Sequence, residues 1–161
     1  MMTVPLSVQA NEKKIDNSPS VKSGRRLTTE LKLVFSSLGY QVIKAKNFIH
    51  TPSHNFVILG EYLDGIYGNK KLDFVLYMKK GGKPIIVEAM RQRVKGSTDE
   101  KLPYTYLNAI KFLPKFDTIF VYEGNGFRKG AIKFMKDKAQ ETGGFEVMEK
   151  SDFIYWLENN K

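Results

Sequence analysis

Four stretches of the chain carry apolar residues at the spacing of one helix face. The first begins after Thr28 or Thr29, either of which can cap a helix, and it ends at Gly39. Its apolar stripe, with spacing i, i+3, i+4 and i+7, consists of Leu31, Val34, Phe35 and Leu38. The same periodicity predicts three more helices, at 99–113, at 127–141 and from Ser151 onward. Each is amphipathic and is expected to place one face in a core.

Shorter apolar runs lie between the predicted helices and indicate strands. Residues 71–78 and 85–92 form two such runs, and the residues between them include the turn formers Gly81, Gly82 and Pro84. Other strands are expected at 56–67, 117–122 and 145–148, with a strand or irregular segment at 40–49 and a tight turn at Gly68 and Asn69. Because strands and helices alternate in the second half of the chain, the pattern predicts an α/β layer structure with some parallel pairing.

Residues 1–26 differ from the rest of the 161-residue chain. They contain few large apolar side chains and show no periodicity, so we expect a flexible N-terminal tail. Residues 27–161 contain enough apolar side chains for one core, and their length fits a single domain.

The chain carries a formal net charge of +9. This favours a polyanionic partner, because each neutralised phosphate releases counterions, although many basic proteins bind no nucleic acid. The chain has no cysteine, which excludes disulfides and thiolate zinc sites. No apolar run reaches the length of a membrane span, and the N-terminus lacks a secretion signal. We therefore expect an unsecreted, cytoplasmic protein without a membrane partner.

Asp73 and Glu88 lie in the two apolar runs on either side of the glycine turn. Side chains alternate between the faces of a strand, so Glu88 and Met90 share one face and Arg91 points to the other. Two carboxylates on paired strands can converge on one hard cation, which prefers oxygen ligands and keeps several waters. An acid on a strand is more often a solvated side chain, so the metal-site interpretation depends on the neighbouring residues.

A basic segment follows Glu88 directly. Acids for a metal ion beside bases for phosphate suggest phosphodiester chemistry. The side chains that we expect to bind nucleic-acid phosphates are Arg91, Arg93, Lys95 and Lys101 here, and Lys44 and Lys46 in an earlier loop at 44–55.

The residues around this pair resemble the PD-(D/E)XK, or restriction-endonuclease-like, nuclease superfamily. The resemblance covers about residues 28–122 and rests on Asp73, the Glu88 motif, the pair Arg91-Gln92 and the segment GSTDEKLPY at 96–104. It implies a restriction-endonuclease-like core, which is a mixed central β-sheet flanked by helices.

The resemblance also implies roles for individual residues. Asp73 and Glu88 would hold Mg²⁺, with Mn²⁺ as the other candidate ion. Glu30 would be a helix-borne acid that orders a water or a second ion, and Gln92 would orient the site.

Position 90 departs from the superfamily pattern, which has a lysine there. Such a lysine positions and helps to activate the attacking water and stabilises charge on the phosphate, whereas the thioether of Met90 does neither. Because methionine is close to lysine in length, a deliberately inactivated form explains the difference, as does a natural loss of activity. A third explanation is a base supplied from another position, such as Arg91 or Lys95.

The resemblance implies a metal-dependent endonuclease of restriction or homing type, prokaryotic or phage-like, that is impaired by Met90. The alternatives are an inactive DNA-binding module with the same fold and a nuclease specific for DNA junctions. A domain of this size holds one active site and cuts one strand, so cleavage of double-stranded DNA implies a homodimer or a larger symmetric oligomer.

Overall fold

The computed structural model describes residues 19–49 and 54–161. Its helices are α1 (Pro19–Ser37), α2 (Leu102–Phe112), α3 (Lys129–Glu141) and α4 (Lys150–Asn160), with 3-10 helices η1 (Ala45–Asn47) and η2 (Ser97–Lys101). Its strands are β1 (Gln41–Lys44), β2 (Phe56–Leu59), β3 (Tyr62–Gly65), β4 (Gly68–Lys71), β5 (Phe74–Tyr77), β6 (Ile85–Arg91), β7 (Asp117–Glu123) and β8 (Phe145–Glu149). Among these described residues, no helix is both long and apolar enough to cross a membrane.

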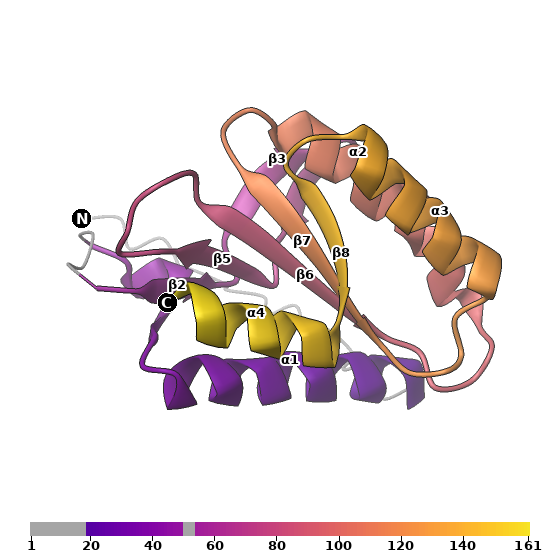
Figure 1. Ribbon diagram of the computed structural model, residues 1–161, viewed down its shortest axis with the longest axis horizontal. Helices are drawn as coiled ribbons and strands as arrows, with labels where there is room; N and C mark the ends of the chain where they lie inside the picture. Colours follow the sequence, from indigo (N-terminus) through magenta and orange to yellow (C-terminus); the bar gives the residue numbers. More distant parts are fainter. Residues whose placement is uncertain (1–18, 50–53) are drawn as a thin grey trace, which may run out of the picture.

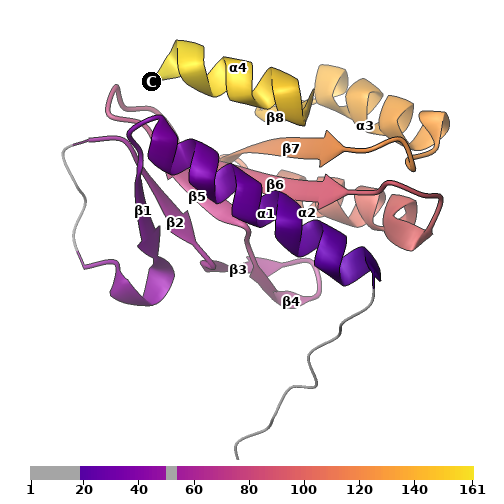
Figure 2. The same cartoon turned by 90° about the horizontal axis from the view of Figure 1, so that it is seen from below.

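Six strands of the described part form one sheet in the order β1-β2-β5-β6-β7-β8 (Figure 1). The pairs β2–β5 and β5–β6 are antiparallel, whereas β1–β2, β6–β7 and β7–β8 are parallel. Helices α1 and α4 cover one face of this sheet, and α2 and α3 cover the other (Figures 1 and 2). The structure therefore confirms the predicted α/β fold with a mixed central sheet flanked by helices.

The face of the sheet under α1 is closed by large apolar side chains. Leu27, Leu31 and Phe35 of α1 are fully buried in one cluster with residues of β5, β6 and α4. The ring of Phe35 lies 5.2 Å from that of Phe74 on β5 and 6.1 Å from that of Phe153 on α4, measured between centroids. Burial of each such side chain contributes about 1.5–3 kcal/mol, so this stripe fixes α1 and α4 against the two central strands.

The segment 56–67 is not one strand, as the sequence pattern predicted. It breaks at Gly60, whose φ of +69° lies in the left-handed region that glycine adopts readily. The part after the break, β3, pairs only with β4 in a separate two-stranded hairpin. The turn of this hairpin lies between Gly65 and Gly68, which pair with each other, and so comes before the predicted turn at Gly68 and Asn69.

Helix α1 begins earlier than its apolar pattern predicts. Residues 19–26, which we expected in a flexible tail, belong to this helix, which starts at Pro19. The remainder of the expected tail, residues 1–18, lies outside the described residues.

Candidate active site

The structure brings Asp73 and Glu88 together. Strands β5 and β6 pair with Phe74 opposite Val87, which places Asp73, the residue before β5, beside Glu88. Asp73 Oδ2 accepts a hydrogen bond from the backbone N–H of Ala89 at 2.9 Å, which holds its carboxyl group against β6 next to Glu88. Glu88 is buried, with 6% of its surface exposed.

The pKa values of both carboxyl groups are raised in the folded protein. Burial and, next, the neighbouring Asp73 carboxylate raise the pKa of Glu88 to about 8. Burial also raises the pKa of Asp73. Two like charges this close disfavour joint ionisation, so each carboxylate adds to the rise in pKa that burial causes in the other.

The chemistry of this pair fits a hard divalent cation. Its donor atoms are carboxylate oxygens, and a 2+ charge between them would relieve the repulsion that raises their pKa values. Within residues 19–49 and 54–161, no group of three or more His, Asp or Glu side chains is arranged to hold a metal. An ion at this site would therefore be bound by two carboxylates and completed by water or backbone oxygens.

Met90 lies on the same sheet face as Glu88, toward α2 and α3. Its half-buried side chain packs against an apolar cluster that includes Leu102 of α2 and Phe120 of β7. The thioether is thus part of the hydrophobic packing between the sheet and these helices, and it offers no donor to the carboxylates.

A lysine-rich pocket of about 540 Å³ borders Asp73. It lies between the middle of α1, the ends of β1 and β2, and the start of β5. Its lysines are Lys32, Lys44, Lys46 and Lys71. Two of the lysines expected to bind nucleic acid, Lys44 and Lys46, are therefore in the same pocket as one of the carboxylates.

A family model for the PD-(D/E)XK nuclease superfamily domain matches residues 19–161. The chain belongs to the PD-(D/E)XK nuclease superfamily. No curated protein matches its sequence. Among solved structures, a protein of unknown function called AF1548 matches with a TM-score of 0.46 and 10% sequence identity over 78% of this chain, and the chain spans 57% of the length of that structure.

Membership of the superfamily gives the chain a nuclease-like function, and the mixed sheet with its flanking helices is a restriction-endonuclease-like core. Nucleases of this superfamily usually use divalent metal ions. The Asp73–Glu88 pair lies within the matched residues and has donors of the required kind.

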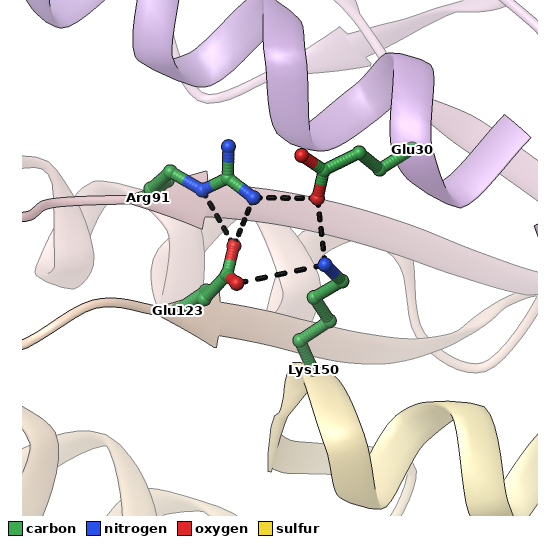
Figure 3. A network of polar contacts seen from close by, with 4 residues as sticks. All are labelled: Glu30, Arg91, Glu123 and Lys150. Carbon is green, nitrogen blue, oxygen red and sulfur yellow. Dashed lines mark hydrogen bonds and ion pairs between the residues drawn. The ribbon is translucent and has the colours of Figure 1, made fainter.

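Glu30, which the superfamily resemblance implies as a helix-borne acid that orders a water or a second ion, lies in an ionic network. Figure 3 shows its carboxylate in a four-residue network with Arg91, Glu123 and Lys150. Arg91 Nη2 donates to Glu30 Oε2 at 2.6 Å, and Lys150 Nζ donates to the same oxygen at 2.6 Å. The printed contacts of Glu30 are thus with Arg91 and Lys150, and its role beside a metal ion stays a prediction.

Arg91 points to the sheet face opposite Glu88, as strand alternation predicts. Its guanidinium contacts both carboxylates of the network, with Nε donating to Glu123 Oε2 at 2.5 Å and Nη2 pairing with the same oxygen. Its side chain is 1% exposed. A nucleic-acid phosphate cannot reach a guanidinium so enclosed without dismantling the network, so this position does not supply the missing base.

The network predicts how Glu30 affects stability in acid. Hydrogen bonds from Lys150 and then Arg91 lower the pKa of Glu30 from 4.5 to about 2. The ionised carboxylate therefore stabilises the folded state above pH 4.5, and this contribution is lost as the pH falls from about 4.5 to 2. We expect Glu30→Gln to lower stability by about 1 kcal/mol or less at pH 7, because the side chain is partly solvated. Melting temperatures of both proteins between pH 7 and pH 2 check this: the difference should shrink with acidity, and a constant difference would contradict it.

Gln92 holds two loops together at the end of β6. Its Nε2 donates to the carbonyl of Gly126 at 2.8 Å and to Asp99 Oδ1 at 3.3 Å, and its Oε1 accepts from the backbone N–H of Thr98 at 3.0 Å. Gln92 thus joins the loop after β6 to the loop after β7. The remaining predicted phosphate ligands, Arg93, Lys95 and Lys101, are exposed on or next to the loop that Gln92 anchors.

Lys70, next to the predicted turn at Gly68 and Asn69, contacts the site directly. Its Nζ lies 2.9 Å from Glu88 Oε1. If residues 70–73 formed one continuous strand, alternation would place the side chain of Lys71, and not that of Lys70, on the same face as Asp73. The chain leaves the extended conformation between β4 and β5, so this alternation does not apply. The signal available in the sequence was only the basic tip of the predicted turn, at 69–71.

Proposed function

We propose that the protein is a metal-dependent endonuclease that hydrolyses DNA, with Mg²⁺ or Mn²⁺ held by Asp73 and Glu88. The observation that supports this most is the position of Asp73, one of the two paired carboxylates, at the edge of a pocket lined by lysines. Metal ligands and phosphate ligands are then adjacent, as phosphodiester hydrolysis requires.

In this proposal, separate residues bind the metal ion and the DNA backbone. A bound divalent ion would polarise the phosphate and make a coordinated water more acidic. Asp73 and Glu88 bind that ion, while Lys44, Lys46 and Lys71 hold the DNA backbone on the pocket side of Asp73. In hydrolysis, the water oxygen bonds to phosphorus as the bond from phosphorus to the leaving sugar oxygen breaks.

Cleavage of DNA with and without metal tests the proposal. Supercoiled plasmid is incubated with the protein in Mg²⁺, in Mn²⁺ and in EDTA, and nicked and linear products are followed over time. Asp73→Asn removes one of two ligand carboxylates, so we expect its rate to fall about a thousandfold, which corresponds to several kcal/mol of lost charge stabilisation. The matched control is Asp152→Asn, since Asp152 is exposed on α4. Equal cleavage by the Asp73 variant, or cleavage that survives EDTA, would contradict the proposal.

The second candidate is an inactive DNA-binding module with the same fold. The packing of Met90 in the apolar cluster favours it, because that position supplies no charge to the carboxylates. Cleavage by Met90→Lys but not by the unchanged protein would support this candidate. A junction-specific nuclease would cut branched DNA in preference to plasmid, and cleavage of both strands would further require a homodimer or larger oligomer.

The lysine-lined pocket gives a separate prediction for binding. Each phosphate neutralised adds about 0.9 to the slope of log K against log salt. Replacing both Lys44 and Lys46 with alanine is therefore expected to lower that slope by about 1.8 if each contacts one phosphate. Fluorescence anisotropy of labelled duplex between roughly 50 and 200 mM salt measures it. Lys83→Ala, at the other end of β6, is the control, and an unchanged slope for the double variant would exclude this pocket as the DNA path.

A further inference from the structure

Lys70 occupies a partly enclosed position beside the candidate metal ligands. Its side chain is 15% exposed and that of Glu88 is 7% exposed, so the ion pair between them is largely shielded from water. The Lys70 ammonium also lies 6.0 Å above the ring of Tyr104, which comes from α2. Strand β4 therefore directs this lysine to the same face of the sheet that carries Glu88 and Met90.

The hairpin that carries Lys70 is fixed to α2 by several contacts. The backbone N–H of Ile66 donates to Asn108 Oδ1 at 2.9 Å, and Lys111 Nζ donates to the carbonyl of Gly65 at 2.9 Å. The rings of Tyr67 and Tyr104 stack with centroids 5.4 Å apart. A Cβ at Gly65 would lie 2.5 Å from Asn108 Oδ1, so this close approach needs glycine. Lys70 is therefore presented by an anchored strand and not by a mobile surface loop.

We infer that Lys70 supplies, from β4, the positive charge that Met90 does not supply from β6. The inference rests on the proposed nuclease function. In this role the Lys70 ammonium binds a non-bridging oxygen of the scissile phosphate and orients the attacking water. An ammonium has three N–H donors, so contact with Glu88 leaves others for the phosphate.

The other basic residues near β6 fit this role less well. Arg91 is enclosed on the opposite face of the sheet, and Lys95 is exposed on the loop beyond the end of the strand. Lys71 lines the pocket on the far side of Asp73. Of these, Lys70 is the one whose ammonium is in contact with a proposed ligand carboxylate, so it lies next to the position where the proposed metal ion would hold the phosphate.

Four variants test the inference by cleavage: Lys70→Met, Met90→Lys, the double variant, and the control Lys83→Met, whose exposed ion pair with Asp117 lies at the other end of β6. We expect Lys70→Met to lower kcat by about a hundredfold or more, with DNA affinity in Ca²⁺ changed less than about threefold. The double variant should recover activity to within about tenfold of the unchanged protein, because a lysine at position 90 restores the charge. The control should cleave normally.

Two outcomes would overturn the inference; the first leaves the proposed function standing, and the second favours the inactive DNA-binding module. In one, Lys70→Met cleaves as fast as the unchanged protein. In the other, the unchanged protein is inactive and Met90→Lys cleaves, which would show that Lys70 does not replace the motif lysine. If neither the unchanged protein nor Met90→Lys cleaves any DNA, the proposed function fails and the inference fails with it.

A measurement without catalysis tests the contact itself. The melting temperatures of the unchanged protein, of Lys70→Met, of Glu88→Gln and of the protein that carries both of these substitutions are compared in metal-free buffer as a double-mutant cycle. Because the ammonium faces the glutamate, the effect of Lys70→Met should depend on whether Glu88 is present. Additive effects would show that the two side chains do not interact in solution and would overturn the inference.

Discussion

Glu88→Gln is expected to abolish metal-dependent cleavage and at the same time to make the metal-free protein more stable at neutral and alkaline pH. The loss of activity follows from the proposed function, in which Glu88 is one of the two ligand carboxylates of the metal ion. The gain in stability follows from burial, because the pKa of Glu88 is about 8 in the folded protein and 4.5 otherwise. Between these values the folded state binds a proton that the unfolded state does not, so the stability of the unchanged protein falls as the pH rises. Glutamine carries no charge and avoids this loss, which is on the order of 3 kcal/mol at pH 7.

Thermal unfolding in EDTA at pH 5, 7 and 9 measures this effect. The difference in melting temperature between Glu88→Gln and the unchanged protein should be small at pH 5 and largest at pH 9. Glu146→Gln is the control, since Glu146 is exposed on β8 and should show no such trend. A Glu88→Gln protein that is less stable than the unchanged chain at pH 9 would show that the carboxylate is well solvated in solution.

Arg91→Met should destabilise the protein more than any surface substitution. The buried guanidinium contacts both Glu30 and Glu123, and its removal leaves two carboxylates with only Lys150 to neutralise them. Removing one partner from a buried ionic group costs about 3–5 kcal/mol. Glu30 and Glu123 keep about a third of their side-chain surface exposed, so we expect about 3 kcal/mol, the lower end of that range.

Urea unfolding at pH 7 checks the prediction through the shift in midpoint at constant slope. Lys133→Met is the matched control, since its ion pair with Asp137 is exposed on α3 and is worth about 0.5 kcal/mol or less. Arg91→Lys should lie between the two, because it keeps the charge but loses the two-pronged geometry of the guanidinium. An Arg91→Met protein no less stable than the Lys133 variant would mean that water readily replaces the network.

Local periodicity was sufficient for most of the fold, because helices and strands that bury one face repeat apolar residues at a fixed spacing. The buried stripe of α1 at Leu31 and Phe35 has such a fixed spacing, and so does the alternation of side chains along β6. The alternation along β6 also predicted that Arg91 points to the sheet face opposite that of Glu88. The break at Gly60 was missed, because a single glycine in an apolar run does not reveal its φ. The hairpin that follows is defined by contacts with α2, which lies some forty residues later.

Some residues of the candidate site could likewise be predicted from the sequence, and others could not. Asp73 and Glu88 come together through two neighbouring strands joined by a short turn, so the sequence was enough to expect their convergence. The position of Lys70 depends on how the β3–β4 hairpin packs against the rest of the protein. The position of the Glu30 carboxylate depends on its contacts with Arg91 of β6 and Lys150 of α4. Both depend on contacts between elements distant in sequence, which no spacing rule encodes.

The network around Arg91 also has a consequence for the order of events during synthesis. Three of its members, Glu30, Arg91 and Glu123, leave the ribosome before Lys150, which begins α4. A nascent chain that has not yet reached α4 contains Arg91, which joins Glu30 to Glu123, but it lacks Lys150, the second cation that contacts both carboxylates. The ionic network around Arg91 is therefore complete only when α4 has joined the sheet.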